Sequence, residues 1–296
     1  MNYVSAATLA FDVIEQGRSL GTGLLESVHQ VLVRGTDADT DQAGRIRTTQ
    51  VAIGSSTGAL EDARFVPMPP GIALDVAVQD LTQWMNRPSV SRDPIVAAAM
   101  AHYQFETLHP FNDGNGRIGR LLVVLQLMAD DLITEPLLIV SPWFEARRTQ
   151  YQDHLAEVSS SGAWDPWIQF FAEGVAASAV DIAERVDRML AVQAAYVQIL
   201  QVAGARGVIR DIADTLISDQ VITIAMMSER FGKTPQAVAP AMQKLVDLGI
   251  LSGPYGTYGR QYIADDVFLA VTAPPGRVPA RDDPLQHDTG ADPSRM

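Results

Sequence analysis

The sequence predicts a mainly α-helical protein with a small β-hairpin and, toward the C-terminus, a winged helix-turn-helix domain. Apolar residues recur at helical spacing over most of the 296 residues. In two places, short apolar stretches flank a glycine turn, which is typical of paired strands. We therefore expect a helical domain at residues 1–200, a winged helix-turn-helix domain at 205–272 and a tail at 273–296.

Helical spacing defines most elements of the first domain. It predicts helices at about residues 3–16, 21–32, 73–85, 94–107, 117–130, 143–159 and 164–202, the last with a break near its middle. Between the second and third helices, Val51 and Ile53 precede a turn rich in glycine and serine, and Phe65 and Val66 follow it. This pattern predicts a hairpin, which the prolines after it would end.

The C-terminal domain has the order of a helix-turn-helix followed by a wing. Helical spacing returns at residues 208–216, 224–231 and 235–248. Short apolar stretches at 249–251 and 261–263 flank a loop with several glycines, so we expect them to pair as two strands. From residue 273 onward the chain is rich in Pro, Asp, Arg and Gly and poor in large apolar residues, a composition typical of disorder.

Composition excludes several classes of protein. The absence of cysteine excludes disulfides and thiolate metal sites. The formal net charge of −13 is opposite in sign to that of proteins whose main task is to grip nucleic-acid phosphates. The chain has no apolar run of roughly 18 residues, which a membrane span requires, and Asp12 and Glu15 lie where a signal peptide needs an apolar core. We expect a cytoplasmic protein without membrane contact.

Residues 109–120, His-Pro-Phe-Asn-Asp-Gly-Asn-Gly-Arg-Ile-Gly-Arg, concentrate groups that bind phosphate. Gly114 and Gly116 permit a tight turn directly before a predicted helix, whose first N–H groups and dipole attract anions. Arg117 and Arg120 are three residues apart and therefore lie on one helix face, where both guanidinium groups can reach the same polyphosphate. The segment is a candidate polyphosphate site.

The same segment offers a metal ligand and a base. The Asp113 carboxylate is a hard oxygen ligand of the kind that holds Mg²⁺ against phosphate oxygens. The imidazole of His109 has an ordinary pKa near neutrality and can accept a hydroxyl proton at cellular pH. Phe111 is expected to anchor the loop in the core. Together these groups are typical of phosphoryl or nucleotidyl transfer, in which positioning and charge stabilisation supply most of the rate.

The segment resembles the Fic motif, His-x-Phe-x-(Asp/Glu)-Gly-Asn-Gly-Arg-x-x-Arg, at all eight specified positions. Residues 44–54 and 63–67 are similar to the two sides of the family's substrate flap, and residues 104–108 are similar to the approach to its motif. The resemblance covers roughly residues 2–180, and a winged helix is a familiar companion in one large Fic subgroup. It implies a Fic-type helical bundle with a hairpin flap.

The resemblance also implies an activity, the transfer of AMP from Mg·ATP to a Ser, Thr or Tyr hydroxyl of a target protein, this chain itself included. His109 would deprotonate that hydroxyl, and Asp113 would bind Mg²⁺. Arg117 would hold the β-phosphate and Arg120 the γ-phosphate. The α- and β-phosphates would lie on Gly114, Asn115 and Gly116.

Two further contacts follow from the same resemblance. The flap would pin a segment of the target as an added strand, a known way of binding extended peptides. The flap residues expected to do so are Val51, Ala52, Ile53, Gly54, Phe65 and Val66. The side chain of Tyr151 would lie against the adenine.

Many members of the family restrain themselves with a helix that carries (Ser/Thr)-x-x-x-Glu-(Gly/Asn), whose glutamate pairs with the second arginine of the motif. The nearest match, residues 22–27, departs from the pattern at Ser27 and resembles a core helix of the fold. In relatives with a winged helix, the inhibitory helix precedes a stretch similar to residues 2–4, where this chain starts. We therefore expect that the inhibitory helix is cut off, lost or supplied by a partner, which leaves Arg120 free for ATP.

The sequence leaves other functions open. The enzyme could transfer another nucleotide monophosphate, a phosphocholine or a phosphoryl group, or the chain could be a transcription regulator that senses ATP. His102, Glu106 and His109 have a spacing that a metal site could use, but the zincin pattern is absent and Pro110 ends the helix. We therefore expect His102 to be structural, and His29 and His154 to be packing or surface residues.

The winged helix is expected to contact protein or form a homodimer rather than bind DNA. Residues 205–263 hold six basic and five acidic side chains, which is nearly neutral. A DNA reader normally presents basic and polar side chains at the start of its recognition helix. Here those positions are Gln236, Ala237, Val238 and Ala239.

Overall fold

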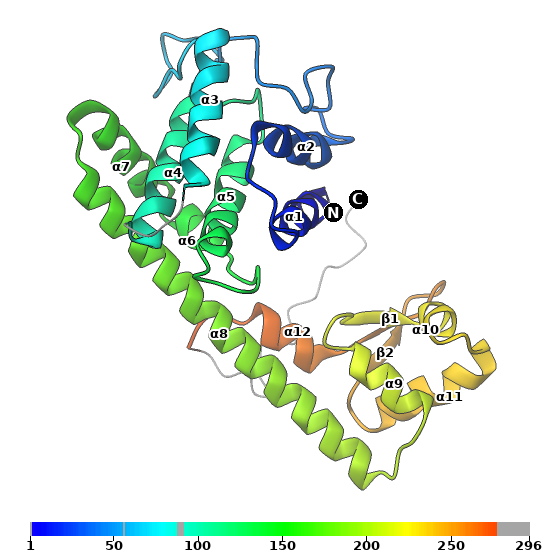
Figure 1. Ribbon diagram of the computed structural model, residues 1–296. Coiled ribbons are helices and arrows are strands. Elements are labelled where there is room, and N and C mark those ends of the chain that lie inside the picture. The colour runs from blue at the N-terminus through cyan, green and yellow to red at the C-terminus, as the bar shows by residue number, and fades with distance from the viewer. Residues whose placement is uncertain (1, 56, 88–91, 277–296) are drawn as a thin grey trace. The chain divides into compact units, whose positions relative to one another are not determined.

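The computed structural model describes residues 2–55, 57–87 and 92–276, which divide along the chain into two units between Ala179 and Val180 (Figure 1). The fold is mainly helical, as the sequence predicts, and it includes a small three-stranded antiparallel sheet. Disorder was expected for a tail at 273–296; residues 277–296 lie outside the described residues, and within the described part Ala273 is buried. In the described ranges, no helix combines the length and the apolar character that crossing a membrane requires.

The first unit is a helical bundle whose elements follow the predicted order. Its helices are α1 (Asn2–Glu15), α2 (Thr22–Val33), α3 (Ile72–Met85), α4 (Pro94–Leu108), α5 (Asn115–Ala129), α6 (Ser141–Ala146), α7 (Arg148–Ser161) and α8 (Trp164–Val202), the last of which continues into the second unit. The single helix predicted at 143–159 is two helices, because the main chain leaves the helical conformation at Arg147 (φ −120°, ψ 29°).

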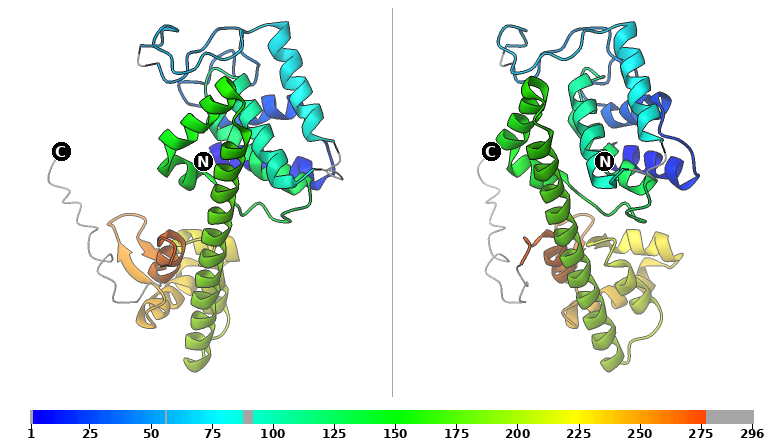
Figure 2. Two further views of the ribbon diagram at one scale, coloured as in Figure 1. Left: turned by 90° about the vertical axis from the view of Figure 1, so that its left-hand side faces the viewer. Right: turned by 60° about the vertical axis from the view of Figure 1, so that its left-hand side comes forward.

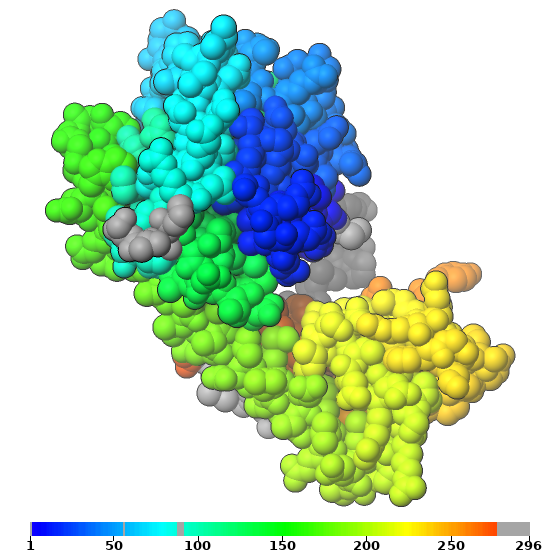
Figure 3. Space-filling view, viewed as in Figure 1, coloured from blue at the N-terminus to red at the C-terminus, as the bar shows by residue number. Residues whose placement is uncertain are grey.

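The central helix of the first unit is α5. Residues 121–128 are all buried, which is the pattern of a helix with protein on every side. α4 packs along α5, and α1, α2 and α3 complete an apolar core that includes Leu25, Phe105 and Phe111. In the space-filling view, α1 to α3, in blue to cyan, form much of the face that the first unit turns to the viewer (Figure 3).

A second core, rich in aromatic side chains, joins α4 and α5 to α6, α7 and the beginning of α8. Phe144, Trp167 and Phe171 are buried in it. The indole N–H of Trp167 donates to the carbonyl oxygen of Ala99 in α4 at 3.0 Å. A hydrogen bond of 2.9 Å between the Tyr103 and Ser159 hydroxyls also joins α4 to α7. These contacts fix α7 beside α4.

The hairpin expected within residues 51–66, which we call the flap, is reduced to one bridge. Ile53 and Phe65 face each other as an antiparallel pair and exchange two main-chain hydrogen bonds, at 2.9 and 3.2 Å. Side chains hold the turn, since the Ser55 and Thr57 hydroxyls donate to the Asp62 carboxylate. The expected hairpin is therefore present as a single antiparallel bridge rather than as two regular strands.

The buried side chain of Arg47 ties the flap to the end of α4. Only 1% of this residue is exposed. Its guanidinium donates to four main-chain carbonyl oxygens, those of Thr49, Met68, Leu108 and His109. The bond from Nε to the His109 oxygen measures 2.8 Å, and the main-chain N–H of Arg47 donates to the Pro110 oxygen at 2.8 Å. One side chain therefore joins both borders of the flap to the segment that carries His109.

α8 runs without interruption from Trp164 to Val202, so the predicted break in its middle was wrong (Figure 2). Oppositely charged side chains one turn apart support the helix at that point. These pairs are Asp181 with Arg185 and Glu184 with Arg188. Both arginines also donate to main-chain carbonyl oxygens of residues 270–273, so the middle of α8 has tertiary partners that its sequence pattern does not reveal.

The second unit combines short helices with the sheet. Its elements after α8 are α9 (Val208–Thr215), β1 (Val221–Thr223), α10 (Ile224–Phe231), α11 (Pro235–Asp247), β2 (Ser252–Tyr255), β3 (Gln261–Ile263) and α12 (Asp265–Thr272). The strand order is β1-β3-β2, and Tyr262 of β3 lies opposite Ile222 of β1. The predicted strand at 249–251 lies instead at 252–255, because Ile250 and Leu251 are buried in the core. β1 was not predicted, and the winged-helix assignment stays a prediction.

We expect Arg47→Met to lower the free energy of unfolding by about 3 kcal/mol, because each buried acceptor left without a donor costs roughly 1–3 kcal/mol. Arg45→Met removes the same charge at an exposed position two residues earlier and should change that free energy by less than about 0.5 kcal/mol. Chemical denaturation of both variants measures the difference. Equal unfolding midpoints would show that Arg47 does not tie the flap to α4.

Candidate functional site

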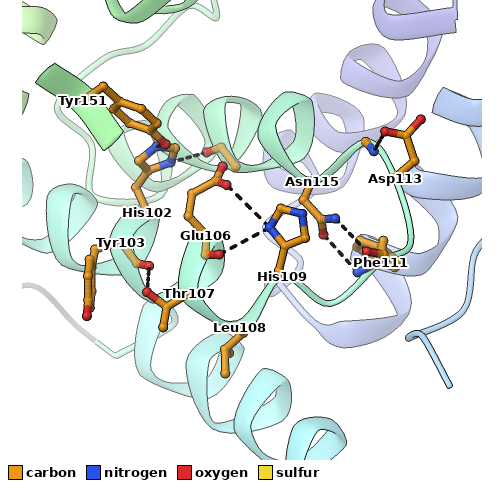
Figure 4. Close-up of polar contacts among 12 residues, drawn as sticks. His102, Tyr103, Glu106, Thr107, Leu108, His109, Phe111, Asp113, Asn115 and Tyr151 are labelled. Atoms are coloured by element: carbon orange, nitrogen blue, oxygen red, sulfur yellow. Dashed lines mark hydrogen bonds and ion pairs between the residues drawn. The ribbon is translucent and has the colours of Figure 1, made fainter. Parts of the chain in front are cut away.

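The position of His109 is set by the way α4 ends. A helix does not readily continue into the proline at position 110, and His109 adopts the left-handed conformation of a helix cap, with φ 48° and ψ 61°. Its N–H donates to the Phe105 carbonyl oxygen at 2.9 Å. The imidazole therefore turns back over the last turn of α4, beside Glu106 (Figure 4).

The imidazole of His109 is largely enclosed, with 19% of the side chain exposed. Its Nδ1 lies 3.4 Å from the Glu106 carbonyl oxygen and 3.9 Å from Oε2 of the Glu106 carboxylate. Burial lowers the pKa of His109 to about 4, an effect that the Glu106 carbonyl opposes and the Arg47 charge reinforces. The ring is therefore neutral at pH 7, and Nε2 is the nitrogen that can accept a proton.

The main chain turns sharply between His109 and α5. Gly114 has φ 79° and ψ −1°, in the left-handed region, and a Cβ atom there would lie 3.3 Å from the Leu32 side chain. Asn115 and Gly116 follow as the first residues of α5, so their N–H groups have no acceptor within the helix. Two such N–H groups at a helix N-terminus have the arrangement that anion sites use.

Arg120 lies over the beginning of α5. A Cβ atom on Gly116 would lie 3.2 Å from Nη1 of Arg120, so the guanidinium and the first turn of the helix are close together. Its Nε donates to the hydroxyl of Ser141, at the start of α6, at 3.0 Å. Burial raises the pKa of Tyr3 and of Glu106, and the positive charge of Arg120 acts against both increases. The sequence did not predict Ser141, because only the fold brings α6 to this point.

Arg117 and Asp113 form an ion pair of 3.6 Å on the outer side of the loop, where 40% and 64% of their side chains are exposed. Asp113 lies across the loop from His109 (Figure 4), and its Oδ1 accepts from the Gly114 N–H at 2.7 Å. Mg²⁺ is usually held by one or two carboxylates together with substrate phosphates, so a single exposed carboxylate at this place fits that ion. The described residues include no group of three acidic or histidine side chains that could hold a metal ion by themselves.

The side chain of Asn115 closes the loop. Its Oδ1 accepts from the Phe111 N–H at 2.9 Å, and its Nδ2 donates to the Phe111 carbonyl oxygen at 2.7 Å (Figure 4). The residue is only 2% exposed. Because its amide is used within the loop, the phosphate contact predicted for Asn115 would come from its main-chain N–H.

His29 of α2 packs against the loop, as the sequence predicts, and it also holds the loop through two hydrogen bonds. Its ring stacks on Phe111, with centroids 4.1 Å apart. Its Nδ1 accepts from the Gly44 N–H at 2.8 Å, and its Nε2 donates to the Asp113 carbonyl oxygen at 3.2 Å. Burial lowers the pKa of His29, which favours the neutral ring that these bonds require. In the sequence, the contact of His29 with this loop is indicated only by a histidine on the apolar face of a helix.

His102 and Tyr151 form a hydrogen-bonded pair beside Glu106. The Tyr151 hydroxyl lies 2.9 Å from Nε2 of His102, whose Nδ1 donates to the Gly119 carbonyl oxygen at 2.9 Å. Burial lowers the pKa of His102 to about 4, so this histidine is neutral. The structural role predicted for His102 is confirmed.

A pocket lies between the flap and α7. Its lining includes Ile53 and Phe65 from the flap, Glu106 and His109 from the end of α4, and Tyr151 from α7. Above it, the Arg64 guanidinium of the flap reaches the Gln152 and Asp153 side chains of α7. The predicted adenine contact would use the ring of Tyr151, since its hydroxyl is bonded to His102.

The nearest match to the inhibitory motif lies on α2, the helix whose His29 packs against the loop of residues 109–116. Residues 22–27 begin α2, as expected for a core helix. The carboxylate of Glu26 accepts a main-chain hydrogen bond from Ile46 and lies near Arg45 and Asp75. These groups, and not Arg120, are the ones that act on the Glu26 carboxylate.

Residues 20–127 match the family model described as "Fic/DOC family", in agreement with the motif at 109–120, so the chain contains a Fic domain. The protein adenylyltransferase fic-1 of Caenorhabditis elegans is 36% identical over 143 residues, which cover 48% of this chain and 25% of that protein. The protein adenylyltransferase Fic of Culex quinquefasciatus is 33% identical over 136 residues, 46% of this chain and 24% of that protein. The chain thus spans about a quarter of the length of these curated relatives.

Among solved structures, a Fic family protein from Desulfovibrio desulfuricans G20 aligns over 88% of this chain and 74% of that chain. The sequence identity is 22% and the TM-score is 0.49.

We expect the His109 imidazole to remain neutral as the pH falls from about 8 to about 5, because its pKa is lowered well below the ordinary value of about 6.5. NMR of protein with ¹⁵N-labelled histidine, assigned with a His109→Gln variant, follows the ring directly. The same residue in urea-unfolded protein should titrate near 6.5 and serves as the reference. A full change from the neutral to the doubly protonated ring, with a midpoint of about 6 or higher in the folded protein, would contradict the enclosed, neutral ring.

We expect Asn115→Ala to lower the free energy of unfolding by about 2 kcal/mol, because the buried N–H and carbonyl groups of Phe111 lose their partners. Asn112→Ala is the matched control, since this neighbouring amide is exposed and bonds only the Thr49 hydroxyl among the described contacts. Thermal or chemical denaturation compares the two. A larger loss for Asn112→Ala would reverse the assignment of Asn115 as the residue that closes the loop.

Proposed function

We propose that this chain transfers AMP from Mg·ATP to a hydroxyl group of a target protein. The observation that carries the proposal is the short loop of residues 109–116, which begins at a neutral imidazole and ends at the N-terminus of α5. A base beside an anion site is the minimum that nucleotidyl transfer requires. The Fic domain and the adenylyltransferase names of the relatives support the same reaction.

The phosphates of ATP would lie across the first turn of α5. The main chain of Gly114 and the N–H groups of Asn115 and Gly116 would hold the α- and β-phosphates, because the helix dipole favours negative charge there. Arg117 would exchange its pair with Asp113 for the β-phosphate. Arg120, already held over this turn by Ser141, would bind the γ-phosphate.

Asp113 would hold Mg²⁺, which neutralises phosphate charge and so makes pyrophosphate a better leaving group. In the proposed step, Nε2 of His109 accepts the proton of the target hydroxyl while the hydroxyl oxygen forms a bond to the α-phosphorus. The bond from that phosphorus to the oxygen bridging to the β-phosphate breaks, and pyrophosphate leaves with the electron pair. Positioning and charge stabilisation supply most of the rate in such transfers.

The flap would bind the target as an added strand. Ile53 and Phe65 border the pocket that also contains His109, and Val66 is 45% exposed beside them. A target segment paired with the main chain of residues 51–54 or 65–66 would bring its Ser, Thr or Tyr hydroxyl toward the imidazole. The ring of Tyr151 would contact the adenine from the opposite border of the pocket.

The second unit would be a winged helix-turn-helix domain that contacts protein. Its elements follow the order that this assignment needs, with α10 and α11 joined by a short turn and β2 and β3 forming the wing. The near balance of basic and acidic side chains at 205–263 disfavours DNA as the partner. A homodimer or an inhibitory partner protein would fit this unit better.

We expect His109→Ala to reduce the labelling of proteins in a lysate by at least about 100-fold when the ATP carries its label at the α-phosphate, because a general base typically contributes that much or more. ATP binding should change by less than about twofold, because in the proposed reaction the imidazole accepts a proton from the target hydroxyl and does not bind phosphate. His154→Ala removes another histidine, on α7, outside the 109–120 segment and should leave labelling unchanged.

The position of the label separates the alternatives. Transfer of a label from the γ-phosphate and not from the α-phosphate would indicate phosphoryl transfer and contradict adenylylation. Labelling by wild type that persists in His109→Ala would show that this histidine is not the base. A screen of nucleotide donors with mass detection identifies any other transferred group.

A further inference from the structure

Glu106 is a buried acid that lacks a partner for one oxygen. Only 12% of its side chain is exposed, and within the described residues Oε1 is buried without a hydrogen-bond partner. Gly119 on α5 makes room for this oxygen, because a Cβ atom there would lie 2.4 Å from it. A buried carboxyl oxygen without a partner lowers the stability of the fold. The presence of Glu106 beside His109 therefore points to a function that would offset this cost.

The other carboxylate oxygen of Glu106 points toward His109. Oε2 lies 3.9 Å from Nδ1 of the imidazole, and the two side chains face each other (Figure 4). The cause is the left-handed cap at His109, which turns its ring back over the last turn of α4. The ring therefore has Glu106 on its Nδ1 side, and Nε2 is its other nitrogen.

Charged and titratable groups from several elements surround this pair. Those that act on Glu106 or lie against it are His102 on α4, Arg120 on α5 and Tyr151 on α7. Those that act on His109 from outside α4 are Arg47 and Asp113. At neutral pH His102 is neutral and Tyr151 is protonated. Of the three groups around Glu106, Arg120 is therefore the one whose charge favours the ionised carboxylate.

We propose that Glu106 is a positioning residue for His109. Its carboxylate lies on the Nδ1 side of the imidazole, keeps Nε2 directed at the target hydroxyl and stabilises the imidazolium that forms when Nε2 accepts the proton. The inference rests on the proposed function in one respect, that His109 is the base of a transfer reaction.

The carbonyl oxygen of Glu106 cannot fill this role alone. At 3.4 Å from Nδ1 it can orient the neutral ring by accepting its N–H, but it carries only a partial charge. The imidazolium carries a full positive charge in a site with little access to water, where a nearby carboxylate stabilises it far more than it would in bulk solvent. The carboxylate therefore acts on the protonated ring, and the carbonyl acts on both forms.

The pH dependence of the pair follows from the ionisation of Glu106. Burial raises the pKa of Glu106 to about 7, although the Arg120 charge opposes the shift. A carboxyl group is neutral below its pKa and ionised above it, so the anionic partner of His109 develops as the pH rises through about 7. The transfer rate should rise over the same range, and titration of His109 cannot cause this step because its pKa is lowered to about 4.

The test compares wild type with Glu106→Gln, which keeps the shape of the side chain and removes its charge. We expect kcat for α-phosphate labelling at pH 8 to fall about 10- to 100-fold, with KM for ATP unchanged. The step in rate near pH 7 should disappear from the kcat profile. Glu106→Asp keeps a charge in the pocket, so it should retain a pH step and part of the rate.

A matched control is Glu157→Gln on α7. Glu157 also follows a three-residue spacing with a histidine, His154, at 3.6 Å, but 56% of its side chain is exposed. The same chemical change at this exposed pair should alter neither kcat nor the pH profile. If Glu106→Gln keeps the wild-type rate and the step near pH 7, the assignment of Glu106 as a positioning residue is wrong.

A measurement without turnover separates this inference from the proposed function. The ¹⁵N signals of the His109 ring in wild type should show an inflection near pH 7 as Glu106 ionises beside it, and Glu106→Gln should lack that inflection. If the inflection is present but wild type transfers no AMP, the proposed function fails and the contact between the two residues stands. If wild type transfers AMP and neither protein shows the inflection, the role of Glu106 fails alone.

Discussion

The site depends on a buried guanidinium that bonds to main-chain oxygens. Arg47 joins the borders of the flap to the last residues of α4, so the carbonyl of His109 is held at the point where the helix ends. A left-handed residue other than glycine carries backbone strain, and such a conformation persists only when its surroundings fix it. The hydrogen bond from Arg47 Nε to the His109 oxygen and the bond from the His109 N–H to Phe105 supply that constraint.

The ends of two helices then divide the chemistry between them. His109 lies at the C-terminus of α4, where the helix dipole is negative and favours a ring that takes up a proton. Asn115 and Gly116 lie at the N-terminus of α5, where the dipole is positive and favours phosphate. Because α4 and α5 pack along each other and the loop between them is short, the His109 imidazole and the candidate anion site lie within one short segment of the chain.

The sequence predicted the elements whose signals are local. The approximate bounds of α1 to α5 and the glycine turn before α5 follow from periodicity, proline and glycine within a few residues of each other. The contacts of Arg47, His29 and Ser141 join residues far apart in the chain, and no spacing rule encodes them. The break wrongly predicted in the middle of α8 also reflects contacts between distant residues. Arg185 and Arg188 donate to carbonyl oxygens of residues 270–273, which lie far along the chain.

The polar residues of the loop differ in how much of their hydrogen-bonding capacity is already used. The amide of Asn115 is bonded to Phe111 and both nitrogens of His29 are bonded to main-chain groups, so these side chains give the loop its shape. The pair Arg117–Asp113 is exposed and weak, as surface ion pairs are, and each member can exchange its partner for a ligand. A motif match counts Asp113, Asn115 and Arg117 equally. The hydrogen bonds divide them into residues that shape the loop and residues that can still bind a ligand. Glu106 belongs to neither group and is named by no motif position; its place beside His109 is known only from the fold.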